Sequence, residues 1–142
     1  MAEGDGAIYN IFKEEVLNGE FDLDTGADAI KVILVTGHTP NIDTHYGYAD
    51  VIGDEESGTG YTAGGETLAN QVTDLDSAND RGTFDADNVT WTGLDVGTPS
   101  HAIMYDDTNA NDRLIAYWEV TTPSNGGDYT LQWNANGILL LT

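Results

Sequence analysis

Cysteine is missing from the 142-residue chain, and so is any apolar run long enough to cross a bilayer. Without cysteine, disulfides and thiolate metal sites are excluded. A membrane-spanning helix needs roughly 20 predominantly apolar residues, and no stretch approaches that length. A chain of this size can form one domain with a substantial core. We therefore expect a soluble domain held together by apolar packing.

Basic residues are also scarce. Four Lys and Arg stand against 25 Asp and Glu, which gives a formal net charge of −21. Nucleic acids and anionic membranes are bound through cationic groups, so neither is an expected partner. The acidic groups repel one another, and salt screens this repulsion. The composition therefore suggests a halophilic or saline host, in which salt or divalent cations stabilise the fold.

The apolar residues alternate with the period of β-strands along much of the chain. Residues 81–94 contain two such runs, one with Phe84 and one ending in Trp91, and we expect the core to form around Trp91. Residues 30–36 are apolar on both faces, which predicts a central strand covered on both sides. Residues 134–137 end in Asn-Gly, which favours a hairpin loop. This pattern predicts a mainly β fold, a single-domain antiparallel β-sandwich or small barrel.

The N-terminal segment differs from the rest of the chain. Residues 1–6 are acidic and glycine-rich, so we expect a flexible N-terminal arm there, followed by a single β-rich domain over residues 7–142. Residues 7–17 show helical spacing of apolar side chains and are followed by Gly19, a typical stop signal. This pattern predicts one N-terminal helix, whose apolar face is covered by the sheet or by a neighbouring subunit.

Two short segments carry parts of known binding motifs. Residues 58–63 fit the loose dinucleotide-binding pattern G-x-G-x-x-A, but no buried strand precedes them and no helix follows. His38, Asp43 and His45 have metal-binding side chains, but their spacing fits no established ligand pattern. We interpret both segments as polar surface loops.

Two further loops are rich in the oxygen ligands that Ca²⁺ prefers. The first loop offers Asp74, Asp76, Asn79 and Asp80, and the second offers Asp106, Asp107, Asn109, Asn111 and Asp112. The predicted ligands among them are Asp74, Asp76, Asp80, Asp107, Asn109 and Asn111. The second loop begins like an EF-hand, but Asp112 replaces the required glycine and Trp118 the final glutamate. Asp and Asn are also favoured in turns without an ion, which is the interpretation we prefer. The sequence therefore implies no cofactor and leaves open only Ca²⁺ or another divalent cation.

Signals of catalysis are missing. The chain has no G-x-S-x-G motif, and its serines occur in turn-like contexts. Trp91, Trp118 and Trp133 could form a sugar-stacking platform, but each lies among alternating apolar residues, which favours core packing. We expect a protein that is not an enzyme.

A set of phrases occurs in a fixed order over most of the chain. They are Phe12-Lys13 with Leu17-x-Gly19, Asp28-x-Ile30-Lys31-Val32-x-Leu34-Val35-Thr36, Pro40-x-Ile42-Asp43-x-His45, Gly58-Thr59-Gly60-Tyr61-Thr62-Ala63-Gly64-Gly65, Phe84-Asp85-Ala86-Asp87-Asn88-Val89-Thr90-Trp91, Tyr105-Asp106-Asp107-Thr108 and Trp133-x-Ala135-Asn136-Gly137-Ile138. In this order they resemble small structural proteins, of the decoration or cement kind, from the virions of tailed bacterial and archaeal viruses. Members of that family often have more lysine, and the acidity of this chain departs from that pattern.

The resemblance implies a non-enzymatic virion protein. We expect a capsid decoration (cement) protein on the outer shell, with the major capsid protein and other virion proteins as partners and a homotrimer as the assembly. The expected interface residues lie in the arm, the helix and the glycine-rich loop: Ala2, Gly4, Gly6, Ile8, Ile11, Phe12, Gly58, Gly60 and Tyr61. The alternatives are a tail, neck or fibre-base component, and a calcium-dependent carbohydrate-binding β-sandwich for host attachment.

Overall fold

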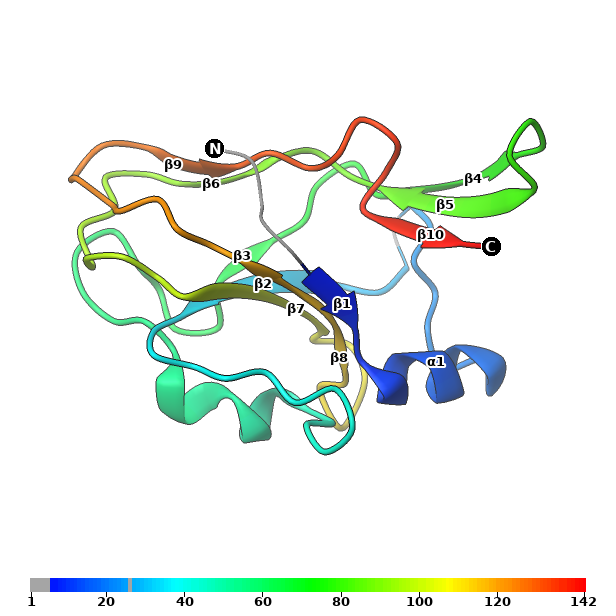
Figure 1. The fold of residues 1–142 in the computed structure, drawn as a ribbon, viewed down its shortest axis with the longest axis horizontal. Coiled ribbons are helices and arrows are strands. Elements are labelled where there is room, and N and C mark those ends of the chain that lie inside the picture. Colours follow the sequence, from blue (N-terminus) through cyan, green and yellow to red (C-terminus); the bar gives the residue numbers. More distant parts are fainter. Residues whose placement is uncertain (1–5, 26) are drawn as a thin grey trace.

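A five-stranded antiparallel sheet lies at the centre of the computed structural model, which describes residues 6–25 and 27–142 (Figure 1). Its strands, in spatial order, are β1 (Gly6–Ile8), β8 (Leu114–Glu119), β7 (His101–Asp106), β2 (Ile30–Val35) and β3 (Glu66–Thr67). β2 and β7 pair along their full lengths, from Ile30 opposite Asp106 to Val35 opposite His101. Nearly every residue of these two strands is buried, so they form the middle of the sheet and of the core.

Two smaller antiparallel sheets form a second layer, which lies above the large sheet in Figure 1. One is three-stranded, in the order β10 (Leu139–Leu141), β5 (Arg81–Asp85), β4 (Val72–Asp76). The other pairs β6 (Val89–Trp91) with β9 (Tyr129–Leu131).

Helical segments lie on the opposite side of the large sheet in this view. They are α1 (Asn10–Leu17) and the short 3₁₀ helices η1 (Tyr48–Asp50) and η2 (Ile52–Asp54). The described chain is therefore mainly β with one α-helix, which confirms the predicted fold class. Its sheets are open and stack on each other, which fits the predicted β-sandwich. The described residues form no closed barrel, the other predicted architecture.

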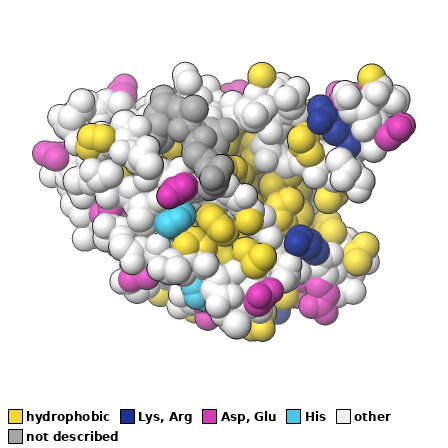
Figure 2. Space-filling view, in the orientation of Figure 1, with side chains coloured by type: hydrophobic (Ala, Val, Ile, Leu, Met, Phe, Trp, Pro, Cys, Tyr) yellow, Lys and Arg dark blue, Asp and Glu magenta, His cyan; other side chains and the backbone are white. Residues whose placement is uncertain are grey.

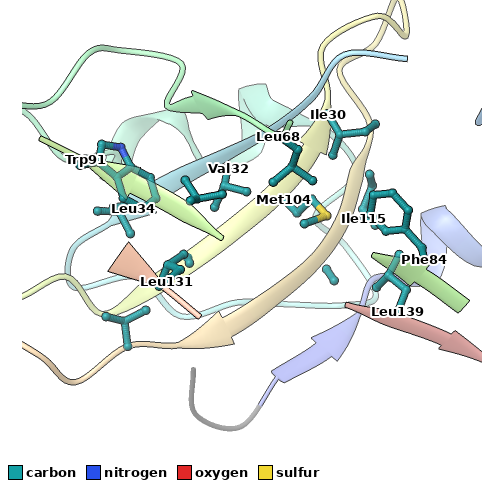
Figure 3. Close-up of a cluster of buried hydrophobic side chains, with 14 of the residues drawn as sticks. Ile30, Val32, Leu34, Leu68, Phe84, Trp91, Met104, Ile115, Leu131 and Leu139 are labelled. Atoms are coloured by element: carbon teal, nitrogen blue, oxygen red, sulfur yellow. The ribbon is translucent and has the colours of Figure 1, made fainter. Parts of the chain in front are cut away.

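Apolar side chains cover both faces of β2, as predicted. Figure 3 shows Val32 and Leu34 directed toward the layer of small sheets, where Trp91 and Leu131 meet them. Ile33 belongs to a second cluster on the other face. Trp91 is completely buried and packs edge-on against Tyr129, with 6.3 Å between ring centroids. Trp91 is thus a core residue, as expected. The two clusters are joined by β2, because apolar side chains on its two faces belong to different clusters.

The N-terminal helix is shorter than predicted. It begins at Asn10, because the residues before it pair with β8 as strand β1, with Gly6 opposite Trp118. A Cβ atom at Gly6 would lie 2.3 Å from the carbonyl oxygen of Tyr117, so glycine permits this close pairing. Gly6 therefore belongs to the sheet, and the other residues of the predicted arm, 1–5, lie outside the described residues. Gly19 has a φ of 77°, the left-handed conformation that suits a residue just after a helix.

The hairpin predicted over residues 134–137 is wrong. The chain does turn there, with the amide of Gly137 donating to the carbonyl of Asn134 at 3.0 Å. However, β9 before the turn pairs with β6, whereas β10 after it pairs with β5. Turn residues specify that the chain reverses, but they do not determine which strand pairs with the segment after the turn. Here β10 pairs with β5, and Leu139 of β10 is buried opposite Phe84.

Candidate functional site

An apolar hollow of about 160 Å³ opens between α1 and the three-stranded sheet. Its lining includes Phe12 and Val16 of α1, Leu23 after the helix, and Phe84 and Leu139 of the sheet. In Figure 2 apolar side chains gather in this region, between the helix and the small sheet. We refer to it below as the apolar hollow.

A glycine creates a notch at one end of the apolar hollow. In the register of the sheet, Gly82 of β5 lies between Leu75 of β4 and Leu141 of β10. Leu75 is 73% exposed and Leu141 is 53% exposed, and a Cβ atom at Gly82 would meet no atom of the described residues within 4 Å. Phe84 and Leu139 are two residues further along their strands and so share this face. Two exposed leucines therefore flank an empty position that leads into the apolar hollow.

The free edge of β4 beside the notch is protected against pairing with another strand. The amide of Leu75 donates to Oδ1 of Asp74 at 2.8 Å, and the amide of Thr73 donates to Oδ1 of Asp24 at 3.4 Å. Carboxylates at an exposed edge occupy its amides and repel an approaching backbone carbonyl. A partner is therefore expected to engage this region through side chains rather than by extending the sheet.

The few cations of the chain are mostly paired. Lys31 pairs with Asp107 at 3.2 Å, Arg81 with Asp76 at 2.8 Å, and Arg113 with Glu15 at 3.2 Å. Lys13 of α1 follows Phe12 and donates a hydrogen bond to Asn10 at 3.0 Å. Figure 2 shows basic side chains at the borders of the apolar hollow. Two of the four cations, Lys13 and Arg81, are the sequence neighbours of Phe12 and Gly82, which line the apolar hollow.

The acidic residues of the first predicted calcium loop do not converge. Asp76 accepts hydrogen bonds from Asn79 and Arg81, both at 2.8 Å, and these contacts hold the pKa of Asp76 below its usual value. Asp74 caps the amide of Leu75, and Asp80 takes a left-handed turn conformation with a φ of 53°. Across the described part of the chain, no three His, Cys, Asp or Glu side chains are arranged to hold a metal ion.

One carboxylate of the second predicted calcium loop is buried, although the sequence predicted a polar turn there. Asp107 is exposed and pairs with Lys31, while Asn109 accepts a hydrogen bond from the amide of Asn111 at 2.9 Å. The residue before them, Asp106, is completely buried at the end of β7. Burial is the main cause that raises the pKa of Asp106 to about 6, and the neighbouring Asp28 raises it further. Extending the apolar alternation of β7 by one residue would have indicated this burial.

The three histidines of the chain gather in one place, although without Asp43. The ring of His38 lies 5.3 Å from that of His45 and 6.4 Å from that of His101, measured between centroids. His38 is buried, so the prediction of a surface loop is wrong at this residue, and its Nδ1 lies 2.7 Å from Oδ2 of Asp54. Asp43 instead accepts a hydrogen bond from α1 at 2.6 Å. Burial, and then the nearby His38, lowers the pKa of His101.

The glycine-rich loop is tied to the large sheet by Glu55. This carboxylate accepts hydrogen bonds from the hydroxyls of Tyr48 and Tyr61, the latter at 2.8 Å, and from the amide of Gly64 at 2.7 Å. The hydroxyl of Tyr61 also accepts a hydrogen bond from the amide of Leu34 on β2 at 3.1 Å. Tyr61, a predicted interface residue, therefore has its hydroxyl directed into the protein.

The glycines of this loop serve close packing. Gly60 has a φ of 79°, and a Cβ atom there would lie 2.4 Å from the carbonyl oxygen of Gly93. Gly58 has a φ of 138°, which also favours glycine. These constraints explain the glycine pattern without a nucleotide.

The other predicted interface residues lie in different settings. Ala2 and Gly4 are outside the described residues. Ile11 and Phe12 are buried in the core, and Ile8 is half-buried on β1. Of these, Phe12 also lines the apolar hollow. The residues that form its notch were not predicted, because their proximity depends on the pairing of three strands.

Comparisons of the chain with protein-family models, with curated proteins and with solved structures found no match. Every helix in the described residues is too short or too polar to span a membrane. Function is therefore inferred from the surface of the chain itself and from its ordered sequence phrases.

Proposed function

We propose that this protein is a non-enzymatic virion structural protein, and specifically a capsid decoration protein on the outer shell of a tailed virus. The observation that carries the proposal is the apolar hollow, with exposed Leu75 and Leu141 at its notch, in a chain of net charge −21. A cluster of exposed apolar side chains around an apolar hollow marks a contact surface. The ordered phrases that resemble small virion proteins support the same function.

The size of the apolar hollow suits one large apolar side chain of a partner. An apolar cavity of about 150 Å³ can hold a benzene molecule. The hollow has about 160 Å³, which is enough for a Leu, Ile, Met or Phe side chain. Burying such a side chain contributes about 1.5–3 kcal/mol. A stable interface buries about 1,600 Å² in total, so the hollow is the anchor of a wider contact.

The proposed partner is the major capsid protein, and the proposed location is the capsid surface. Attachment there adds buried area between neighbouring shell subunits and requires no chemistry. A homotrimer suits this role because linked copies present the same anchor several times, and linked weak contacts bind together more tightly than each alone. Salt at the particle surface screens the repulsion between acidic copies.

The proposal is tested by cosedimentation of the purified protein with shells of its virus from which the protein has been stripped. We expect wild-type protein to sediment with the shells and Gly82→Val to lose at least about tenfold in affinity, since about 1.4 kcal/mol corresponds to a factor of ten. Valine fills the notch, and the position is sterically open. Valine also favours strands, so the melting temperature of this variant should equal or exceed that of wild type.

The matched control is Gly53→Val on η2, where a Cβ atom also meets no atom within 4 Å. It should bind shells like wild type. Binding of Gly82→Val at wild-type affinity would exclude the apolar hollow as the contact. Failure of the wild-type protein to bind stripped shells would exclude decoration.

The alternative position within the virion is a tail, neck or fibre base. Electron cryomicroscopy of purified particles separates the two positions by copy number. Many copies spread over the shell support decoration, whereas a few copies at one vertex or along the tail support the alternative.

A further inference from the structure

A second pocket, of about 270 Å³, is lined almost entirely by polar side chains. Three segments contribute to it: the end of α1 with the residues after it, one residue shortly before β2, and the end of β7 with the loop that follows. The lining residues are Glu15, Glu20, Asp28, Asp106, Thr108, Asn109, Ala110 and Asn111. We refer to it as the acidic pocket.

Asp106 gives the acidic pocket a carboxylate oxygen that no described N–H or hydroxyl group neutralises. The residue is completely buried, and its Oδ1 accepts hydrogen bonds from the amides of Thr108 at 2.8 Å and Asn109 at 3.2 Å. Its Oδ2 is buried, no N–H or hydroxyl group of the described residues donates to it, and the group beside Asp106 is the carboxyl group of Asp28. A buried carboxylate oxygen with no partner is costly unless a positive charge meets it. Because Asp106 lines the pocket, the pocket is where such a charge can be placed.

Asp28 brings a second carboxylate beside Asp106. The two side chains are near enough for the charge of Asp28 to act on Asp106. Oδ2 of Asp28 accepts a hydrogen bond from the amide of Asp22 at 2.6 Å, which leaves Oδ1 for a ligand. Two neighbouring carboxylates repel each other, and a divalent cation between them turns this repulsion into attraction. Glu15 is paired with Arg113 at 3.2 Å, so we do not count it as a ligand.

The walls of the acidic pocket are joined by hydrogen bonds across the two segments. The amide of Ala29 donates to Oγ1 of Thr108 at 2.7 Å, and the amide of Asp107 donates to the carbonyl of Ala29 at 2.9 Å. These bonds hold Asp28 and Asp106 in place before any ion arrives, which lowers the cost of binding.

We propose that the acidic pocket binds one divalent cation, Ca²⁺ in preference to Mg²⁺, anchored by Asp106 and Asp28. Ca²⁺ takes about 6–8 oxygen ligands in flexible geometry, whereas Mg²⁺ demands a regular octahedron. The described side chains form no cage of three carboxylates, so amide oxygens of the loop and water complete the shell. A site with two carboxylate anchors has moderate affinity, about 10⁻⁴–10⁻³ M. Of the two adjacent aspartates of the loop this site uses Asp106 and not Asp107, and it adds Asp28 from a distant segment.

The experiment is isothermal titration calorimetry of the full chain with CaCl₂, in about 0.15 M and about 1 M NaCl, because salt at the higher concentration screens diffuse attraction. We expect one saturable Ca²⁺ site at both salt concentrations and weaker binding of Mg²⁺. Asp106→Asn should weaken Ca²⁺ binding at least about tenfold, the loss typical of disturbing a metal site. Its amide keeps an oxygen for the two loop amides, so folding is preserved.

The matched control is Asp107→Asn, which removes the same charge one residue away from an exposed side chain. It should leave the affinity unchanged. If the heat of Ca²⁺ binding disappears at the higher salt concentration, or if both variants lose the same Ca²⁺ affinity, the ion binds diffusely to an acidic surface. Either result would overturn the proposed site. If Asp106→Asn does not fold, Asp28→Asn replaces it with the same expected loss. Equal affinities for the two ions would overturn the preference for Ca²⁺.

Discussion

Leu75 and Leu141 lie on either side of Gly82 across the three-stranded sheet, and both leucine side chains are largely exposed. The two residues are far apart in the sequence and belong to the two outer strands of that sheet. Each would be unremarkable as a single exposed leucine. Together with the missing side chain at Gly82 they form a notch that leads to Phe84 and Leu139.

Replacing both leucines by asparagine should separate attachment from stability. Because both side chains are exposed, we expect Leu75→Asn with Leu141→Asn to change the free energy of unfolding by no more than about 1 kcal/mol. Cosedimentation with stripped shells should be lost, because the notch no longer offers apolar area. The control is Ile52→Asn on η2, which is 50% exposed. Retained sedimentation of the double variant would contradict the prediction.

Truncation of the buried tryptophan should be severe. Trp91 is completely buried in the cluster that contains Leu34 and Leu131. Trp91→Ala should lower the free energy of unfolding by about 3–5 kcal/mol, measured by urea denaturation. Trp133→Ala, at a half-buried ring, should cost less. Equal losses at the two positions would show that Trp91 has no special place in the core.

The strands could be predicted from alternation, but their partners could not. Residues 30–36 indicated a strand covered on both faces, and β2 has both faces buried. The same period did not reveal that β5 and β6 enter different sheets, because alternation describes the faces of a strand and not its neighbours. The notch at Gly82 and the pairing of Asp106 with Asp28 both depend on contacts between distant segments. Local patterns of Asp and Asn marked Asp106 and Asp107 alike as oxygen ligands, because they cannot distinguish the buried side chain of Asp106 from the exposed one of Asp107.

The network around Glu55 should hold the glycine-rich loop against the sheet. Glu55→Ala removes the acceptor for the hydroxyls of Tyr48 and Tyr61 and for the amide of Gly64. Burial raises the pKa of Tyr61, so its hydroxyl stays a donor that needs an acceptor. Because each unsatisfied buried group costs about 1–3 kcal/mol, we expect a loss of at least that size.

Amide hydrogen exchange checks where this loss acts. Exchange should accelerate over residues 58–65 in Glu55→Ala and remain unchanged in Glu14→Ala, which alters an exposed carboxylate on α1. Acceleration spread evenly over the whole chain would indicate a global effect and contradict a local role for Glu55.

The histidine cluster should make the fold sensitive to acid. Burial and His38 lower the pKa of His101, whereas Glu119 raises it, with a net lowering from 6.5. The unfolded chain therefore takes up a proton as the pH falls through about 6.5, before the folded chain does. The free energy of unfolding should decrease below that pH, until the folded state is protonated as well. His101→Gln should remove this part of the decrease, measured by urea denaturation at a series of pH values. Parallel curves for the variant and wild type would contradict it.

The acidic surface should make stability depend on salt. At a net charge of −21, repulsion among the carboxylates opposes the compact state. The screening length falls from about 10 Å in 0.1 M salt to about 3 Å in 1 M salt, so the melting temperature should rise over this range. A variant with three exposed acids neutralised, Glu14→Gln, Asp95→Asn and Asp128→Asn, should be more stable in low salt and should gain less from added NaCl. Calorimetric scans of both proteins measure this difference. A melting temperature that is independent of salt in the wild type would show that charge repulsion has no part in its stability, and the inference of a saline host would then have no physical basis.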